Sequence, residues 1–307
     1  MKRVIILNPH SRNGSARSIF EAQRPKWEGI LGGFDLHLTR HAGDATETVA
    51  KLLEEGRTDQ ILVAGGDGSI NEACRGYWLN GRATPPNVPL GIINLGTGGD
   101  LFRTVNAASE DYEQALANNA SRLVDAAEVT IDGGETRQFL NISSVGLGGD
   151  MLRSLKSSRF QAGAAAYFYH TLKTLVKYRS VPARFSLRDN DGTHEHDLDL
   201  VNFFVCNGRF SGGGMQWAPD AALDSGTLCI TAIAGPRKLP LVLHSRKVYA
   251  GQLDAFPGAR TFRAGEIRIT TEAPVSLETD GEIVEAGHDG GTDFRYRVLP
   301  AAFPLVM

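Results

Sequence analysis

A glycine-rich turn that carries one acid stands directly after an apolar run early in the chain. Residues 61–64 are apolar, residues 65–69 read Gly-Gly-Asp-Gly-Ser, and a helix is expected from Ile70. Glycines let a backbone approach a phosphate closely, and the N–H groups of the turn and helix start can bind phosphate oxygens. Asp67 suits such a place if it faces Mg²⁺. The turn therefore predicts a phosphate site, and the alternative is a plain strand-to-helix turn capped by Asp67 or Ser69.

Two further polar segments follow apolar strands in the same half of the chain. Residues 96–100, Gly-Thr-Gly-Gly-Asp, come after the expected strand 90–93, and residues 8–14 come after the expected strand 3–7. The carboxyl ends of parallel strands meet at one edge of a sheet, where ligands bind in such folds. There Thr97 can donate a hydroxyl to phosphate, and Asp100 supplies a second acid. The polar side chains of the 8–14 segment are suited to hold ribose or phosphate.

Apolar runs and helical stretches alternate through the first 127 residues, which predicts a parallel α/β domain. Helices are expected at 14–31 and 44–55, with Pro25 at a helix start or kink, and a strand is expected at 34–39. The pattern then changes to strands separated by turns, which predicts a mainly antiparallel β domain with one helical stretch at 162–178. The strands of this second region are expected at 128–150, 183–206, 226–233, 265–278 and 294–298.

Several common nucleotide-binding signatures are missing from the sequence. It has no G-x-x-x-x-G-K-[ST] run, and the cluster at 65–69 differs from G-x-G-x-x-G. The H-R-D and D-F-G set of protein kinases is missing as well. These absences argue against a P-loop kinase, a dinucleotide-binding domain and a protein kinase.

The order of the motifs resembles that of the diacylglycerol kinase catalytic-domain family, in particular the small bacterial lipid kinases related to sphingosine and ceramide kinases. The motifs that carry the resemblance run through nearly the whole chain, and several ordered motifs are more specific than any one. They are Asn8-Pro9-His10-Ser11, Gly65 to Ser69, Gly96 to Asp100, Asn141 to Gly148, Asn207-Gly208, Gly212 to Gly214, Pro219-Asp220-Ala221, Asp224 to Leu228, and Glu278-Thr279-Asp280-Gly281-Glu282.

The resemblance implies an N-terminal α/β domain of the NAD kinase and phosphofructokinase type at 1–127, which binds ATP. It implies a β-sandwich-like lipid-substrate domain at 128–290 with a helical insertion near 151–180, and a 291–307 segment that returns to the first domain. The active site is expected in the cleft between the domains. The nucleotide-binding residues expected on this basis are Asn8, Pro9, Ser11, Thr39, Gly65, Gly66, Asp67, Gly68, Ser69, Asn71, Gly96 and Thr97.

The resemblance also implies an in-line transfer of the γ-phosphoryl group of Mg²⁺-ATP. Asp67 and Asp100 are expected to organise Mg²⁺, and Glu282 or Asp280 is expected to receive the acceptor's proton. Both acids would face one way only if the strand through Gly281 stays regular, and solvated acids on a hairpin turn are the alternative.

Three positions depart from the family pattern. Ser69 replaces a threonine and keeps the hydroxyl, whereas Gly99 replaces an asparagine, so one side-chain amide is missing. Ser225 replaces an acid in a loop that holds a structural Mg²⁺ in bacterial members, which puts a metal site at Asp224 in doubt.

Composition limits the partners. The net charge of −3 offers no bulk attraction to nucleic acid, so no nucleic-acid partner is expected. The first apolar run is too short for a signal peptide, and no stretch approaches the ~20 apolar residues of a membrane span. A cytoplasmic protein with peripheral membrane contact is expected. The apolar residues of the insertion recur at helical spacing, which usually indicates core packing, and the local basic charge makes lipid contact the alternative. Cys74, Cys206 and Cys229 are interpreted as reduced core residues. A homodimer is left open.

The function expected from this sequence is phosphorylation of a lipid hydroxyl at the membrane surface. Diacylglycerol, ceramide, a sphingoid base, monoacylglycerol and a polyprenol are all compatible acceptors. Two alternatives remain: a kinase of a soluble substrate, such as an NAD kinase, and a catalytically idle nucleotide- or lipid-binding protein.

Overall fold

The computed structural model describes residues 1–79, 87–158, 163–189, 192–235, 238–284 and 290–307. The chain divides into two compact units. Unit 1 comprises Met1–Val124 and Ala301–Met307, and unit 2 comprises Asp125–Pro300.

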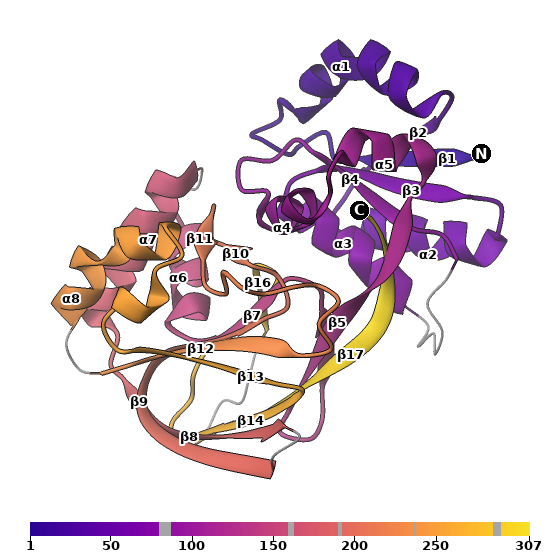
Figure 1. The fold of residues 1–307 in the computed structure, drawn as a ribbon. Helices are drawn as coiled ribbons and strands as arrows, with labels where there is room; N and C mark the ends of the chain where they lie inside the picture. The colour runs from indigo at the N-terminus through magenta and orange to yellow at the C-terminus, as the bar shows by residue number, and fades with distance from the viewer. Residues whose placement is uncertain (80–86, 159–162, 190–191, 236–237, 285–289) are drawn as a thin grey trace. The chain divides into compact units, whose positions relative to one another are not determined.

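Unit 1 is a parallel sheet between two layers of helices. The strands β1 (Arg3–Leu7), β2 (Asp35–Leu38), β3 (Gln60–Gly65) and β4 (Leu90–Asn94) pair in the order β4-β3-β1-β2, and Leu305 of β17 (Asp293–Val306) pairs with Leu90. Figure 1 shows α1 (Ala16–Leu31) and α5 (Tyr112–Asn118) on one face of this sheet, with α2 (Asp44–Glu55) and α3 (Asp67–Trp78) on the other. Every residue of β1 and β3 is buried. A strand covered on both faces requires the near-continuous apolar runs that the sequence shows.

The predicted helices of unit 1 need two adjustments. Helix α3 begins at Asp67, three residues before the expected start: Gly65 ends β3, Gly66 is the N-cap, and Asp67 and Gly68 belong to the first turn of the helix. Pro25 lies inside α1, which excludes the helix start and leaves the kink as the expected alternative. Helix α4 (Asp100–Ala108) begins at the acid of the second glycine turn.

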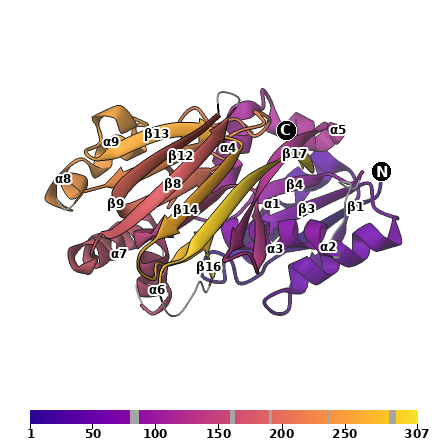
Figure 2. The ribbon, with the colours of Figure 1, turned by 90° about the horizontal axis from the view of Figure 1, so that it is seen from below.

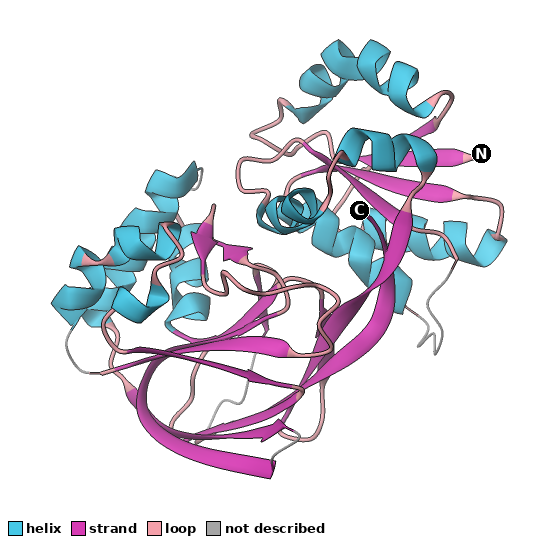
Figure 3. Ribbon diagram, in the orientation of Figure 1, coloured by secondary structure: helices cyan, strands magenta, loops and turns pink. Residues whose placement is uncertain are grey.

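Unit 2 is built mainly of antiparallel strands, with helices gathered at one end (Figure 3). Its principal strand order is β16-β15-β7-β9-β8-β14-β17, with β12 pairing β9 and β13, and β5 pairing β17 and β6. The bounds of these strands are β5 (Ser121–Ile131), β6 (Thr136–Phe139), β7 (Ile142–Gly146), β8 (Val181–Asp189), β9 (Gly192–Cys206), β12 (Leu228–Ala234), β13 (Ala259–Ala264), β14 (Glu266–Thr271), β15 (Leu277–Thr279) and β16 (Glu282–Val284). A separate pair joins β10 (Phe210–Ser211) to β11 (Met215–Gln216). The predicted fold class, parallel α/β followed by antiparallel β with a helical insertion, is confirmed.

Strand β9 separates two apolar cores within unit 2. Phe203 and Val205 lie in a core formed by side chains of the strands. Phe204 and Cys206 lie in a second core, on the opposite face of β9, which the helices of unit 2 cover. Successive side chains of a strand point to opposite faces, so both faces of residues 200–206 are buried and this end of β9 does not alternate between buried and exposed positions. Residues 192–195, at the other end of the strand, are exposed. Figure 2 shows β9 beside β12 and β8, with the unit's helices close by.

The helices of unit 2 are more numerous than the sequence predicts. They are α6 (Leu147–Lys156), α7 (Gly163–Lys177), α8 (Lys238–Leu243), α9 (Ser245–Tyr249) and the short 3₁₀ turn Leu253–Ala255. The expected strand 128–150 is therefore wrong over its last four residues. Gly146, with φ +113°, ends β7, and the Gly148 N–H then binds Asn202 Oδ1 at the start of α6.

The three cysteines are free and buried, as predicted. Among the described helices, none has both the length and the apolar character needed to cross a membrane.

Candidate active site

Ser69 joins the loop after β1 to the turn after β3. Asn8 Nδ2 donates a hydrogen bond to Ser69 Oγ at 3.0 Å, and the hydroxyls of Ser11 and Ser69 lie 3.2 Å apart. A side chain on Gly65 would place its Cβ 2.6 Å from Ser69 Cβ, so only glycine fits there. The structure thus brings three predicted nucleotide-site residues, Asn8, Ser11 and Ser69, together at the carboxyl edge of the sheet. The hydroxyl that Ser69 retains is the centre of this cluster.

The two glycine turns touch through their backbones. A Cβ on Gly96 would lie 2.5 Å from Gly66 Cα, and Gly96 N–H binds Gly65 O at 3.0 Å. Asp67 fixes the same contact, because its two oxygens accept hydrogen bonds from the N–H groups of Gly99 and Asp100 at 2.7 and 2.8 Å. Asp67 therefore links the two turns through hydrogen bonds and also places a carboxylate beside them.

Gly99 is the position where the family pattern has asparagine. Its φ is +66°, and a Cβ there would overlap the Asn94 amide. Asn94 Oδ1 in turn accepts the Gly96 N–H at 3.1 Å. A side-chain amide therefore lies beside this turn after all, contributed by the end of β4 instead of by residue 99.

A pocket with about 580 Å³ of empty space, its open mouth included, lies next to the Ser69 cluster. Three predicted residues, Asn8, Thr39 and Ser69, line it. His10, from the polar 8–14 segment, lines it too, as do His41 and Glu72, which were not predicted from the sequence. Glu72 Oε2 accepts the Gly43 N–H at 3.1 Å, so α2 and α3 meet at this wall. Of the remaining predictions, Asn71 is buried within α3 and Thr97 is exposed on its turn, and neither lines the pocket.

Across the described residues, no group of three or more His, Cys, Asp or Glu side chains forms a metal site. Asp67 and Asp100 do approach one another: a Cβ on Gly98 would lie 2.5 Å from Asp67 Oδ2 and 3.9 Å from Asp100 Oδ2. Two carboxylates completed by phosphate oxygens and water are a donor set that Mg²⁺ accepts. Asp224 is exposed, and its loop is closed by hydrogen bonds from Gly226 N–H to Asp125 and from Ser225 Oγ to Thr227 O.

Asp280 and Glu282 do not share one face of a regular strand. Asp280 and Gly281, with φ of +47° and +80°, form a two-residue turn that joins β15 to β16. Positive φ at both central residues is the type I′ hairpin, for which Asp-Gly is a preferred sequence. The Asp280 carboxylate turns back and accepts three backbone N–H bonds of 2.9 to 3.0 Å, from Leu140, Asn141 and Ile142. Glu282 begins β16 opposite Thr279 and is half-buried.

Glu278 is a buried acid to which the sequence reasoning gave no role. Ser144 Oγ and the Gly281 N–H each donate to its carboxylate at 3.0 Å. Burial raises the pKa of Glu278 from 4.5 to about 7, although these two hydrogen bonds lower it. Glu278 therefore supports the same turn that presents Glu282. Glu278 opens the 278–282 motif, but the motif does not indicate its contacts, because its partner Ser144 lies on β7 and is brought opposite it only by the sheet register.

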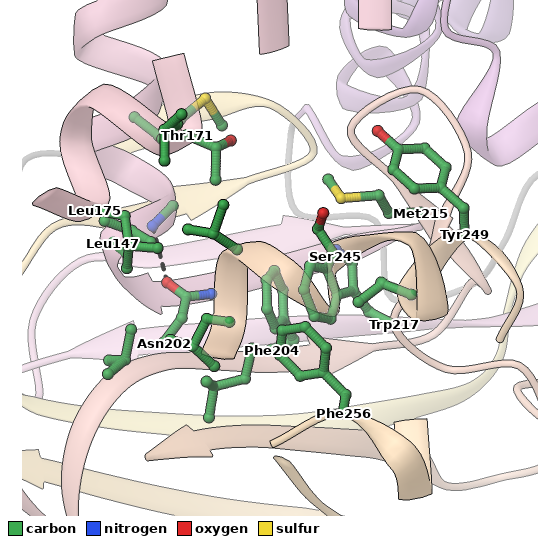
Figure 4. Close-up of a pocket in the computed structure, with 18 residues that line it drawn as sticks. Leu147, Thr171, Leu175, Asn202, Phe204, Met215, Trp217, Ser245, Tyr249 and Phe256 are labelled. Carbon is green, nitrogen blue, oxygen red and sulfur yellow. Dashed lines mark hydrogen bonds between the residues drawn. The ribbon is translucent and has the colours of Figure 1, made fainter. Parts of the chain in front are cut away.

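Unit 2 also contains an apolar pocket with about 810 Å³ of empty space, its open mouth included. Leu147 of α6, Leu175 of α7 and Phe204 of β9 are among its lining residues (Figure 4). The rings of Phe204 and Trp217 stack at 4.1 Å and form part of its wall. The further lining residues are Gly148, Met151, Thr171, Leu172, Val201, Asn202, Met215, Ile233, Leu241, Val242, Ser245, Val248, Tyr249 and Phe256.

Two family models together match almost the whole chain. The diacylglycerol kinase catalytic domain matches residues 2–133, and the YegS C-terminal NAD kinase beta sandwich-like domain matches residues 141–307. The chain therefore belongs to the YegS-type lipid kinases of the diacylglycerol kinase catalytic-domain family, and the resemblance predicted from the motifs is confirmed.

Individual relatives agree with this assignment. A probable lipid kinase YegS-like protein of Alcanivorax borkumensis is 26% identical, over 100% of this chain and 97% of its own. A diacylglycerol kinase of Mycobacterium tuberculosis is 26% identical, over 92% of this chain and 88% of its own. A crystal structure of a provisionally assigned diacylglycerol kinase from Bacillus anthracis superposes with a TM-score of 0.72. It is 22% identical and covers 99% of this chain and 97% of its own, which shows the shared fold.

Proposed function

We propose that this protein transfers the γ-phosphoryl group of ATP to the hydroxyl of a lipid at a membrane surface. The observation that carries the proposal is the apolar pocket of unit 2, because its lining suits a hydrocarbon chain and suits a polar acceptor such as NAD poorly. The family supports phosphoryl transfer, and the paired glycine turns of unit 1 support a phosphate site.

In this proposal the nucleotide lies along the carboxyl edge of the unit 1 sheet. The phosphates meet the glycine turns and the N-terminus of α3, where backbone N–H groups and the helix dipole favour negative charge. The ribose and base extend toward Asn8, Thr39 and His41. Glu72 lines the same pocket, and its carboxylate favours hydroxyl or amino groups over phosphate.

Asp67 and Asp100 would hold Mg²⁺ together with the phosphates. The metal would offset the charge on the transferred group, as in other phosphoryl transfers. Asp67 also keeps the two turns in register through its bonds to Gly99 and Asp100, so the phosphate cradle is formed before the nucleotide arrives. Preorganised dipoles of this kind reduce the reorganisation needed during reaction.

The acceptor proton goes to Glu282 in the proposed step. The acceptor oxygen forms a bond to the γ-phosphorus, the bond from that phosphorus to the bridging oxygen breaks, and ADP leaves. Asp280 is the weaker candidate for the base, since its oxygens already accept three N–H bonds. We assign Asp280 a positioning role: it holds the turn that presents Glu282.

A direct phosphoryl-transfer assay would identify the class of acceptor. Labelled γ-phosphate from ATP and Mg²⁺ is offered to diacylglycerol, ceramide, sphingosine and monoacylglycerol in mixed micelles, and to NAD in buffer. We expect a phosphorylated lipid, with diacylglycerol first by family. Phosphorylated NAD with no lipid product would refute the proposal, and ATP binding without transfer to any acceptor would indicate a binding protein.

A further inference from the structure

The outer side of α7 combines exposed apolar and basic residues. Tyr169 and Val176 are 52% and 68% exposed, and Lys173 and Lys177 are exposed as well. These four residues lie at positions i, i+4, i+7 and i+8, which places them on one side of an α-helix. We call these four residues the α7 outer face.

The inner side of the same helix closes the apolar pocket. Thr171, Leu172 and Leu175 of α7 line it, and Figure 4 shows Thr171 and Leu175 at its wall. Helix α8 packs against α7 and repeats the arrangement: Leu241 and Val242 line the pocket, whereas Leu243 is 69% exposed. One layer of helix therefore separates the pocket from an exposed apolar surface.

Charge indicates what this surface meets. The segments 163–179 and 238–249 contain several basic residues and no Asp or Glu, although the whole chain carries −3. Lys173, Lys177 and Arg246 have no acidic partner among the described residues. The arginines on the sheet of unit 2 differ, since Arg184 and Arg268 pair with Asp197 and Asp293 at 2.8 Å. Exposed apolar side chains among unneutralised lysines are typical of helices that lie in an anionic membrane interface.

We propose that the α7 outer face, together with Leu243, docks unit 2 on a bilayer of anionic phospholipid. Tyr169 and Val176 enter the headgroup region, and the lysines meet lipid phosphates. The pocket then lies directly beneath the docked helices, and the acceptor's chain passes into it from the bilayer. This last step depends on the proposed lipid kinase function, whereas the docking itself does not.

The test measures binding of the full-length protein to vesicles by co-sedimentation. Vesicles of phosphatidylcholine alone are compared with vesicles that also contain phosphatidylglycerol. We expect binding that requires the anionic lipid and weakens with salt. The K173E/K177E variant should bind at least about tenfold more weakly, because each basic residue near an anionic surface contributes about 1 kcal/mol. Val176→Asp should also weaken binding.

A matched control carries the same change of charge elsewhere. The K51E/R57E variant alters two exposed residues of unit 1 and should bind vesicles as the wild type does. Equal vesicle binding by K173E/K177E and the wild type would overturn the proposal, as would a wild type that ignores anionic vesicles. A change in oligomeric state of K173E/K177E with unchanged vesicle binding would show a protein interface instead.

An activity measurement separates this proposal from the proposed function. K173E/K177E should phosphorylate a dispersed short-chain diacylglycerol normally and lose activity only on vesicles. If the wild type phosphorylates no lipid but still requires its α7 outer face to bind anionic vesicles, the kinase proposal fails and the docking stands.

Discussion

At the scale of single residues, Glu278 is the most buried of the acids near the predicted catalytic turn. It is buried, and its pKa is raised to about 7. Between pH 4.5 and 7 the folded protein holds a proton that an unfolded chain releases, so the free energy of unfolding falls as the pH rises. This contribution is complete below pH 4.5 and is lost as the pH passes about 7.

The Glu278→Gln variant tests this linkage. Because glutamine does not titrate, we expect the wild type to lose about 2 to 3 kcal/mol of unfolding free energy between pH 5 and pH 8 relative to the variant. Urea unfolding of both proteins at the two pH values measures the difference. Parallel pH dependence in the two proteins would mean that Glu278 is not buried in this way.

A second residue-scale prediction concerns Gly99 and Asn94. Restoring the family's residue with Gly99→Asn should destabilise the protein by about 1 to 2 kcal/mol, because the new Cβ overlaps the Asn94 amide. Adding Asn94→Ala should recover most of the loss. A double-mutant cycle of melting temperatures measures the coupling. If the effects of the two substitutions on stability are additive, the Asn94 amide does not take the place of the amide that the family's asparagine provides at position 99.

Residue types were easier to predict than their contacts. Asn8 and Ser69 could be placed at one edge of the sheet because they follow parallel strands, whereas Thr39 was expected only from the family resemblance; all three line one pocket. The roles of Asp280 and Glu278 could not be read, since they depend on N–H groups and a hydroxyl some 134 to 140 residues away. His41 and Glu72 were missed because helix contacts, and no local motif, turn them into the pocket.

At the scale of elements, α7 is the helix with two distinct sides. Its inner residue Leu175 is only 4% exposed and lines the apolar pocket. Leu175→Trp should fill part of the pocket and raise KM for a long-chain acceptor by about tenfold or more, with little effect on a short-chain acceptor or on ATP. The measurement is steady-state kinetics with acceptors of two chain lengths.

Leu123→Trp is the control for this prediction, because Leu123 is 46% exposed in unit 1 and lies outside the pocket. It should leave both acceptors unaffected. An unchanged KM for the long-chain acceptor in Leu175→Trp would exclude the pocket as the chain site.

Some elements were predicted with the correct type and bounds, and others only in part. Helix α2 runs over the expected residues 44–55, since its apolar positions recur at helical spacing between two turns. The first four residues of α6 were assigned to a strand region, since Gly148 and Gly149 have low helix propensity. Tertiary contacts override that propensity, and Gly149 is required where the helix packs on Ser276.

At the scale of the whole molecule, the order of motifs along the chain was sufficient to predict the family and the fold class. Strand alternation indicated a parallel sheet, and the turn-rich second half indicated an antiparallel one. The apolar pocket had no such signal. Its lining extends from Leu147 to Phe256 and takes one to three residues from each of seven described elements, so only the folded chain reveals it.

The central claim is that Glu282 receives the proton of a lipid hydroxyl as that hydroxyl attacks the γ-phosphate of ATP, whose binding depends on the glycine turns and not on Glu282. The measurement that tests it most directly is γ-phosphate transfer to diacylglycerol by the wild type and Glu282→Gln, with ATP affinity measured on both. The account predicts a kcat at least about 100-fold lower in Glu282→Gln, with an unchanged Kd for ATP. A Glu282→Gln variant that turns over like the wild type would contradict it.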